Sequence, residues 1–236
     1  MSVILTYIRT FLIVKASQTD PADFSVTEEE SELFRIPPGG VKIMKAMRTL
    51  LQEKNFESVT TAEISPVAGV NEALIYRYFG DKRGLLHRIL AAYFRVHLAR
   101  IRLDVDEVTG AVNKLKTLIK GTISFHKQNS VFSRILLLEV RNHPTYFESE
   151  AYDLAKDYSR LINEIIERGI ELNEIRDDIP LSCMRDIIIG SIERACMRPA
   201  IFDRDFDESL LAENLAEAVI GGLRTPITSG RSLCAN

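Results

Sequence analysis

Histidine and cysteine, the side chains that most often bind metals or act as nucleophiles, form no recognisable site in this sequence. The histidines are His87, His97, His126 and His143. They show no metal-ligand spacing with one another or with a cysteine pair, so we predict structural or surface roles for them and no metal. There is also no nucleophile elbow, phosphate-binding glycine loop or paired-carboxylate site. We therefore expect no catalytic residue, no cofactor and no enzyme.

The cysteines Cys183, Cys196 and Cys234 are odd in number and far apart in the 236-residue chain. This spacing argues against a disulfide framework and favours a reducing compartment. We expect a cytoplasmic protein.

Basic residues gather in one part of the chain. Residues 36–103 contain 11 Lys and Arg against 5 Asp and Glu, a net charge of +6, whereas the whole chain has a net charge of -3. The remainder therefore carries -9. Chance clustering is one explanation, but a basic segment beside an acidic one is typical of a nucleic-acid partner.

The segments that must position these charges show helical periodicity. No alternating strand pattern is present, so we predict an all-α fold with about nine helices. Several prolines, among them Pro144, Pro180 and Pro199, fall at the predicted boundaries, and a Pro37-Pro38 breaker precedes the first helix. The predicted helices span residues 41–55, 60–67, 71–79, 81–103, 107–128, 130–142, 144–173, 181–198 and 207–223.

The ends of the chain differ from this pattern. The apolar stretch at residues 3–14 is too short to span a bilayer and lacks the flanks of a secretory signal, so we predict no membrane partner. For the N-terminal extension, 1–36, we favour a loosely ordered arm over an accessory helix. We expect a first domain at 37–84, a larger second domain at 85–225, and a tail at 226–236.

The most informative stretch is residues 60–86, TTAEISPVAGVNEALIYRYFGDKRGLL. Thr60 and Asn71 are suited to cap two short helices, and Gly69 suits the tight turn between them. The corner of such a helix-turn-helix needs buried apolar residues. We assign this role to Ile64, Val70, Ile75 and Phe79.

This stretch resembles the TetR/AcrR family of transcriptional repressors over residues 41–90. The resemblance rests on Thr60, Ile64, the turn 68–70, the box 75–79, and Asp81-Lys82 followed by a leucine pair. It implies an N-terminal three-helix helix-turn-helix domain joined to a C-terminal helical domain that binds a ligand and dimerises. The implied protein is a repressor that binds palindromic double-stranded DNA as a homodimer.

The resemblance also implies which residues contact DNA. Arg77 is the expected reader of a guanine, and Lys82 would hold a backbone phosphate. Tyr76 and Tyr78 would lie near sugar and phosphate, although both could instead be core aromatics. The complete predicted DNA-binding set is Thr60, Thr61, Asn71, Glu72, Ala73, Tyr76, Arg77, Tyr78 and Lys82.

Three residues depart from the family pattern. Glu72 places an anion where basic or neutral residues are common, which lowers affinity near phosphates unless it accepts a hydrogen bond from a cytosine. Pro66 removes a hydrogen bond from the second helix, which we expect to be kinked or shortened. Leu74 replaces a small hydroxyl residue. An alternative function is therefore a ligand-binding or protein-interaction module on the same fold without sequence-specific DNA binding.

The C-terminal half shows a weaker resemblance. Residues 133–153 and 165–180 are similar to the branch of the family that regulates fatty-acid degradation and responds to acyl-coenzyme A. The resemblance implies a small hydrophobic effector, with ordinary packing or surface ion pairs as the alternative for each residue. The predicted ligand-binding residues are Phe125, Phe132, Leu136, Arg141, Tyr158, Ile162 and Arg194.

The last two predicted helices resemble the pair that forms a four-helix dimer interface in the family. We expect the ligand to tilt the helix that begins at Asp81, change the separation of the two reading heads and release DNA. The predicted interface residues are Ile188, Ile192, Leu211, Leu215 and Val219. Ile187, Leu210 and Ile220 share these apolar faces.

Overall fold

The computed structural model describes residues 36–202 and 204–225, so the predicted N-terminal arm and tail lie outside the described residues. The prediction of an all-α fold is confirmed: the described residues form nine α-helices and no strand. None of these helices has both the length and the hydropathy needed to cross a membrane. The helices are α3 (Pro38–Glu53), α4 (Thr61–Ala68), α5 (Ala73–Phe79), α6 (Lys82–Asp106), α7 (Ala111–Gln128), α8 (Ser130–Leu138), α9 (Glu150–Glu171), α10 (Leu181–Phe202) and α11 (Glu208–Leu223).

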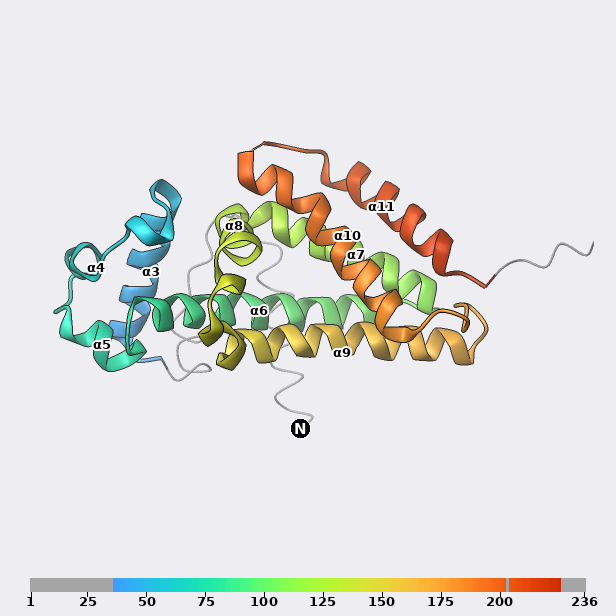
Figure 1. The fold of residues 1–236 in the computed structure, drawn as a ribbon, viewed down its shortest axis with the longest axis horizontal. Coiled ribbons are helices and arrows are strands. Elements are labelled where there is room, and N and C mark those ends of the chain that lie inside the picture. Colours follow the sequence, from blue (N-terminus) through green and yellow to red (C-terminus); the bar gives the residue numbers. More distant parts are fainter. Residues whose placement is uncertain (1–35, 203, 226–236) are drawn as a thin grey trace, which may run out of the picture.

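Helices α3, α4 and α5 form one end of an elongated molecule (Figure 1). Helix α4 begins with a capping box, in which Thr60 Oγ1 accepts a hydrogen bond from Glu63 N at 3.2 Å and Glu63 Oε2 accepts one from Thr60 N at 3.0 Å. It ends at Gly69, whose φ of 63° lies in the left-handed region that favours glycine. These local signals set the turn that the sequence predicts.

Prolines end fewer helices than we predicted. Helix α3 begins at Pro38 rather than residue 41, because a proline at the first helical position loses no hydrogen bond. Helix α4 continues past Pro66 to Ala68, and α10 continues past Pro199 to Phe202. Both prolines lie within the last turn or so of their helices, where the missing N–H removes a single backbone hydrogen bond.

Other helices are shorter than we predicted because a capping residue starts them later. Gly110, with a φ of 82°, precedes α7, so that helix begins at residue 111 instead of 107. Ser149 accepts a hydrogen bond from Tyr152 N and starts α9 at residue 150 instead of 144. The preceding residues form the 3₁₀ turns η2 (Val140–Asn142) and η3 (Pro144–Glu148) in place of longer α-helices.

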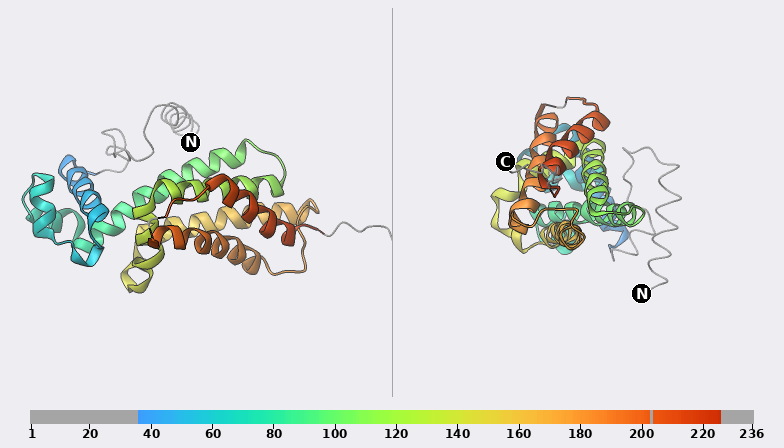
Figure 2. Two further views of the ribbon diagram at one scale, coloured as in Figure 1. Left: turned by 90° about the horizontal axis from the view of Figure 1, so that it is seen from above. Right: turned by 90° about the vertical axis from the view of Figure 1, so that its right-hand side faces the viewer.

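Helix α6 joins the two ends of the molecule. Its first half packs into a core that extends from α3, α4 and α5 to α8. Its second half packs into another core, formed with α7, α9, α10 and α11. In Figures 1 and 2, α6 runs out of the α3–α5 end and along α9, while α10 and α11 lie on one outer side. A change in the tilt of α6 would therefore reach both cores.

Candidate functional site

The exposed face of α5 carries the predicted reading residues. Asn71 Oδ1 accepts a hydrogen bond from Ala73 N at 2.8 Å and thereby caps the start of the helix. Asn71, Ala73, Tyr76 and Arg77 are exposed, with Tyr76 at 52%. A hydrogen bond of 3.1 Å joins the Tyr76 hydroxyl to Thr61 Oγ1 on α4. Helices α4 and α5 lie together at this end of the molecule (Figure 1), and we call the exposed residues Asn71, Ala73, Tyr76 and Arg77 the reading surface.

Beneath this surface lie the apolar residues that we predicted at the corner of the helix-turn-helix. Ile64 and Ile75 are fully buried, and Val70 and Phe79 pack against the same core. Tyr78 differs from Tyr76 because it is half-buried and packs with this core. Only its exposed edge remains available to a partner.

Lys82 and Thr60 are already engaged within the chain. The Lys82 ammonium donates to the backbone carbonyl oxygens of Phe56, Glu57 and Val59 at 2.9, 3.3 and 2.8 Å. It therefore fastens the start of α6 to the 3₁₀ turn η1 (Phe56–Ser58), and its three protons have partners before any phosphate arrives. Thr60 likewise uses its hydroxyl in the capping box. We regard both as residues that position the surface.

Glu72 lies at the junction of the turn and α5. It is half-exposed, occupies the N-cap position in a helical conformation, and makes no capping hydrogen bond with its side chain. Its carboxylate therefore borders the same surface as Arg77.

A cavity of about 240 Å³ lies in the larger half of the molecule. Helices α6, α7, α8, α9 and α10 all contribute to its wall. Five of the predicted ligand-binding residues line it: Phe125, Phe132, Leu136, Arg141 and Tyr158.

Two predicted ligand-binding residues lie elsewhere. Ile162 is fully buried in the core around α7 and α9, one helical turn beyond Tyr158, and does not reach the cavity. Arg194 is exposed, and its Nη1 lies 3.6 Å from Met197 Sδ. Arg141 reaches the cavity but is paired: its guanidinium donates to both carboxylate oxygens of Glu193, with one bond at 2.8 Å.

Polar side chains meet inside this largely aromatic cavity. Thr122 Oγ1 lies 3.3 Å from His97 Nε2 and 2.9 Å from the Tyr158 hydroxyl. We call His97, Thr122 and Tyr158 the polar triad. Nearby, His126 Nδ1 lies 2.7 Å from Ser133 Oγ. Burial raises the pKa of the Tyr158 hydroxyl, so this group keeps its proton at neutral pH.

The two cavity histidines are expected to make the protein acid-sensitive. Burial lowers the pKa of His97 to about 3 and that of His126 to about 4, whereas an unfolded histidine titrates near 6.5. The unfolded chain therefore binds more protons, and stability present above pH 6.5 is lost as the pH falls toward 4. We expect each histidine to lower the free energy of unfolding by on the order of 2 kcal/mol between pH 7 and pH 5.

Urea unfolding at the two pH values measures this loss. His97→Gln and His126→Gln should each show a smaller loss than the wild type, and His143→Gln should match the wild type. An identical pH dependence in all four proteins would contradict the prediction.

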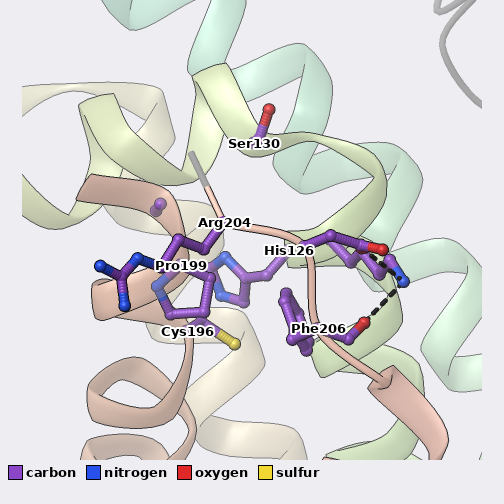
Figure 3. Close-up of a pocket in the computed structure, with 9 residues that line it drawn as sticks. His126, Ser130, Cys196, Pro199, Arg204 and Phe206 are labelled. Atoms are coloured by element: carbon purple, nitrogen blue, oxygen red, sulfur yellow. Dashed lines mark hydrogen bonds and ion pairs between the residues drawn. The ribbon is translucent and has the colours of Figure 1, made fainter. Parts of the chain in front are cut away.

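A second pocket, also of about 240 Å³, shares His126 with the first (Figure 3). It is bordered by Cys196 and Pro199 of α10 and by the segment that leads to α11. Lys127 also lines this pocket. Its ammonium donates to the Phe206 carbonyl oxygen at 2.7 Å and pairs with Asp205 at 3.1 Å. Our sequence reasoning did not predict this pocket.

Two helices link the cavity to the α3–α5 end. Phe94 and His97 of α6 line the cavity, and the same helix begins at Lys82 beside η1. Helix α8 contributes Phe132 and Leu136 to the cavity wall, while its Arg134 donates to the Leu51 carbonyl oxygen of α3 at 2.9 Å. A ligand that displaced α6 or α8 at the cavity would therefore also move the part of that helix that contacts the α3–α5 end.

Part of the predicted dimer interface on α10 and α11 is wrong. Ile188 and Ile192 are 0% and 2% exposed, so their side chains pack inside this chain instead of facing a second copy. Leu211, Leu215 and Val219 are half-buried against the same core. The exposed large apolar residues of these helices are Ile187, Ile201, Phe202 and Leu210.

Sequence reasoning missed several cavity residues. The missed residues include Phe94 and His97, spaced i, i+3 on α6, and Thr122 and His126, spaced i, i+4 on α7 on either side of the predicted Phe125. Polar residues on otherwise apolar helical faces were the available signal. A histidine considered without its i+3 and i+4 neighbours does not give this signal.

Both the N-terminal and the C-terminal part of the chain match known protein families. The family described as "Bacterial regulatory proteins, tetR family" matches residues 43–89, and "YsiA-like protein, C-terminal region" matches residues 93–222. A fatty acid metabolism regulator protein of Bacillus subtilis is 22% identical over 186 residues, covering 79% of this chain and 96% of the relative.

Two solved structures share the fold. The fatty acid degradation regulator FadR from Bacillus halodurans has a TM-score of 0.71 at 22% identity, covering 80% of this chain and 98% of that one. FadR from Bacillus subtilis in complex with stearoyl-CoA has a TM-score of 0.70 at 22% identity, covering 78% of this chain and 98% of that one.

Proposed function

Because the chain belongs to the tetR family of bacterial regulatory proteins and has a YsiA-like C-terminal region, we propose that it is a transcriptional repressor released by a small effector. It binds operator DNA as a homodimer, and the effector is an acyl-coenzyme A. The observation that carries this proposal is the course of α6, which begins beside the reading surface and lines the cavity. The proposed role is regulatory and not enzymatic, and DNA binding favours a cytoplasmic location.

The exposed face of α5 supports direct reading of DNA. A short helix can insert its N-terminal end into the major groove, where the bases display distinct donors and acceptors. Arg77 supplies the paired donors that suit guanine, and Asn71 and Tyr76 flank it on the same exposed face. Lys82 acts indirectly in this proposal, because its bonds to η1 hold α6 under the surface.

The cavity and the relatives support an acyl-coenzyme A effector. The cavity is lined by residues of five helices and is mostly apolar, which is typical of small-molecule sites. One relative is a fatty acid metabolism regulator protein, and one similar structure was solved in complex with stearoyl-CoA. We transfer the acyl-coenzyme A class, and not the chain length, to this protein.

Release follows from the connection between the two sites. An acyl group in the cavity presses on Phe94 of α6 and Phe132 of α8, and both helices contact the α3–α5 end. The effector lowers DNA affinity to the extent that it binds the tilted state more tightly than the DNA-bound state. Binding at the cavity and binding at the reading surface therefore shift the same equilibrium between the two states in opposite directions.

Dimerisation is proposed to use the exposed apolar residues of α10 and α11. We expect the double variant Ile187→Glu/Leu210→Glu to sediment as a monomer at micromolar concentration, because four carboxylates would be buried in a symmetric interface. Its operator affinity should fall at least about 100-fold, since each reading head then binds alone.

Leu138→Glu, an equally drastic change at an exposed leucine of α8, is the control and should remain dimeric. A dimeric double variant, as judged by analytical ultracentrifugation, would contradict this interface.

The alternative of a module without sequence-specific DNA binding rested on Pro66 and Glu72. Since α4 continues through Pro66, only the half-exposed carboxylate of Glu72 still favours it. Gel shifts with the DNA upstream of the protein's own gene, from low to high salt, separate the two functions. A repressor gives a specific complex that outlasts nonspecific binding as salt rises. The absence of any specific complex at low salt would sink the repressor proposal.

A further inference from the structure

We propose that the cavity selects an acyl group that ends in a flat ring bearing an oxygen acceptor, which the hydroxyls of Thr122 and Tyr158 hydrogen-bond. This inference rests on the proposed function, since it specifies the acyl part of the effector. It goes beyond that function because an unsubstituted alkyl chain would leave one donor of the polar triad without a partner.

The first argument is a count of protons in the polar triad. Burial keeps His97 neutral, so each of the three groups supplies one N–H or O–H proton. Two contacts join the groups, from Thr122 to His97 and from Thr122 to Tyr158, and they use two protons. If His97 Nε2–H donates to Thr122, one of the two hydroxyls keeps a proton that no member of the triad accepts. If Nε2 accepts instead, both hydroxyl protons are used and the remaining proton is on His97 Nδ1.

The second argument concerns which group offers that proton. The His97 ring stacks on Phe125, with 4.3 Å between ring centroids and 22° between ring planes, so its nitrogens point in fixed directions. An oxygen acceptor on the ligand favours the arrangement in which His97 Nε2–H donates, because the free proton is then on Thr122 or Tyr158, whose hydroxyl can rotate toward the ligand. Leaving a buried donor unpaired costs about 1–3 kcal/mol, so a bound alkyl group is penalised and an oxygen acceptor is favoured.

The third argument is the shape and size of the cavity. Nine of its eighteen lining side chains carry aromatic rings, whereas four are aliphatic. Aromatic walls suit a flat ring through offset and edge-to-face contacts. An apolar cavity of about 150 Å³ holds benzene. The present 240 Å³ therefore suits a ring with a few substituent atoms better than a long chain.

Isothermal titration calorimetry without DNA tests the inference with a matched pair of probes. 4-Methoxyphenylacetyl-CoA and 4-ethylphenylacetyl-CoA differ only in one ether oxygen, which replaces a methylene. We expect the methoxy compound to bind at least about fivefold more tightly. The double variant Thr122→Val/Tyr158→Phe should bring the two affinities within about twofold. Tyr146→Phe, which removes another cavity-lining hydroxyl, should preserve the preference.

Stearoyl-CoA serves as a third probe, so that this inference and the proposed function can fail separately. Equal affinities of the wild type for the matched pair would overturn the inference, as would a preference that survives the double variant or disappears in Tyr146→Phe. Binding of stearoyl-CoA alone would overturn the inference but leave an acyl-coenzyme A effector in place. Binding of none of the three would overturn both the inference and the effector part of the proposed function.

Discussion

Replacing Arg77 with alanine is expected to weaken specific operator binding strongly. Arg77 is exposed on α5, and its guanidinium carbon lies 5.9 Å from the centre of the Tyr78 ring. Loss of one base-reading arginine costs about 1–3 kcal/mol per site, and a homodimer loses two at once. Affinity should therefore fall at least about 30-fold when measured by fluorescence anisotropy with a labelled operator.

The control for this prediction is Arg102→Ala. Arg102 is an exposed arginine of α6, about 30 Å along the helix from Lys82 at 1.5 Å per residue. It removes the same charge and should change affinity by less than about threefold. The prediction would be contradicted if Arg77→Ala and Arg102→Ala weakened operator binding equally, and by the same factor on random DNA. Arg77 would then contribute only its charge to DNA affinity and would not read a base.

Filling the cavity is expected to produce a repressor that no longer responds to its effector. Ala155 of α9 lines the cavity, and a phenylalanine there would occupy the space of the acyl group. Ala155→Phe should bind operator within about threefold of the wild type, because α5 and its supports are untouched. The effector concentration that releases half of the DNA should rise at least about 30-fold, since the added ring removes most of the contact area.

Glu164→Phe places the same ring on an exposed position of α9 and should release DNA like the wild type. Circular dichroism melting should show both variants folded. Normal release from the Ala155→Phe variant would show that the effector binds elsewhere, with the pocket beside His126 and Cys196 as the next candidate.

The local features of the reading head could be predicted from the sequence because they depend on neighbours in the chain. The caps at Thr60 and Asn71 and the left-handed Gly69 each involve residues a few positions apart. The bonds of Lys82 could not be predicted, because the carbonyl oxygens that it contacts lie 23 to 26 residues earlier. Only the tertiary fold brings them together.

The same distinction applies to the cavity. Helical spacing groups Phe132 with Leu136, and both line the wall. It also groups Tyr158 with Ile162. Tyr158 lines the cavity, whereas Ile162 packs into the core that α6 forms with α7, α9, α10 and α11. The pairing of Arg141 with Glu193 spans 52 residues, so this predicted ligand-binding arginine already has its charge paired within the chain. Periodicity identifies a buried face but does not say which neighbour fills it.

The proposed coupling is tested most directly by measuring both affinities of the wild-type protein reciprocally. Operator affinity is measured with and without saturating octanoyl-, stearoyl- or 4-methoxyphenylacetyl-CoA, and the affinity for each thioester is measured with and without operator. Linkage requires the tightest thioester to weaken operator binding by the same factor by which operator weakens thioester binding. We expect a shared factor between about 5 and 150. Thioester affinity that is unchanged by operator would contradict the account, because the cavity and the reading surface would then be independent.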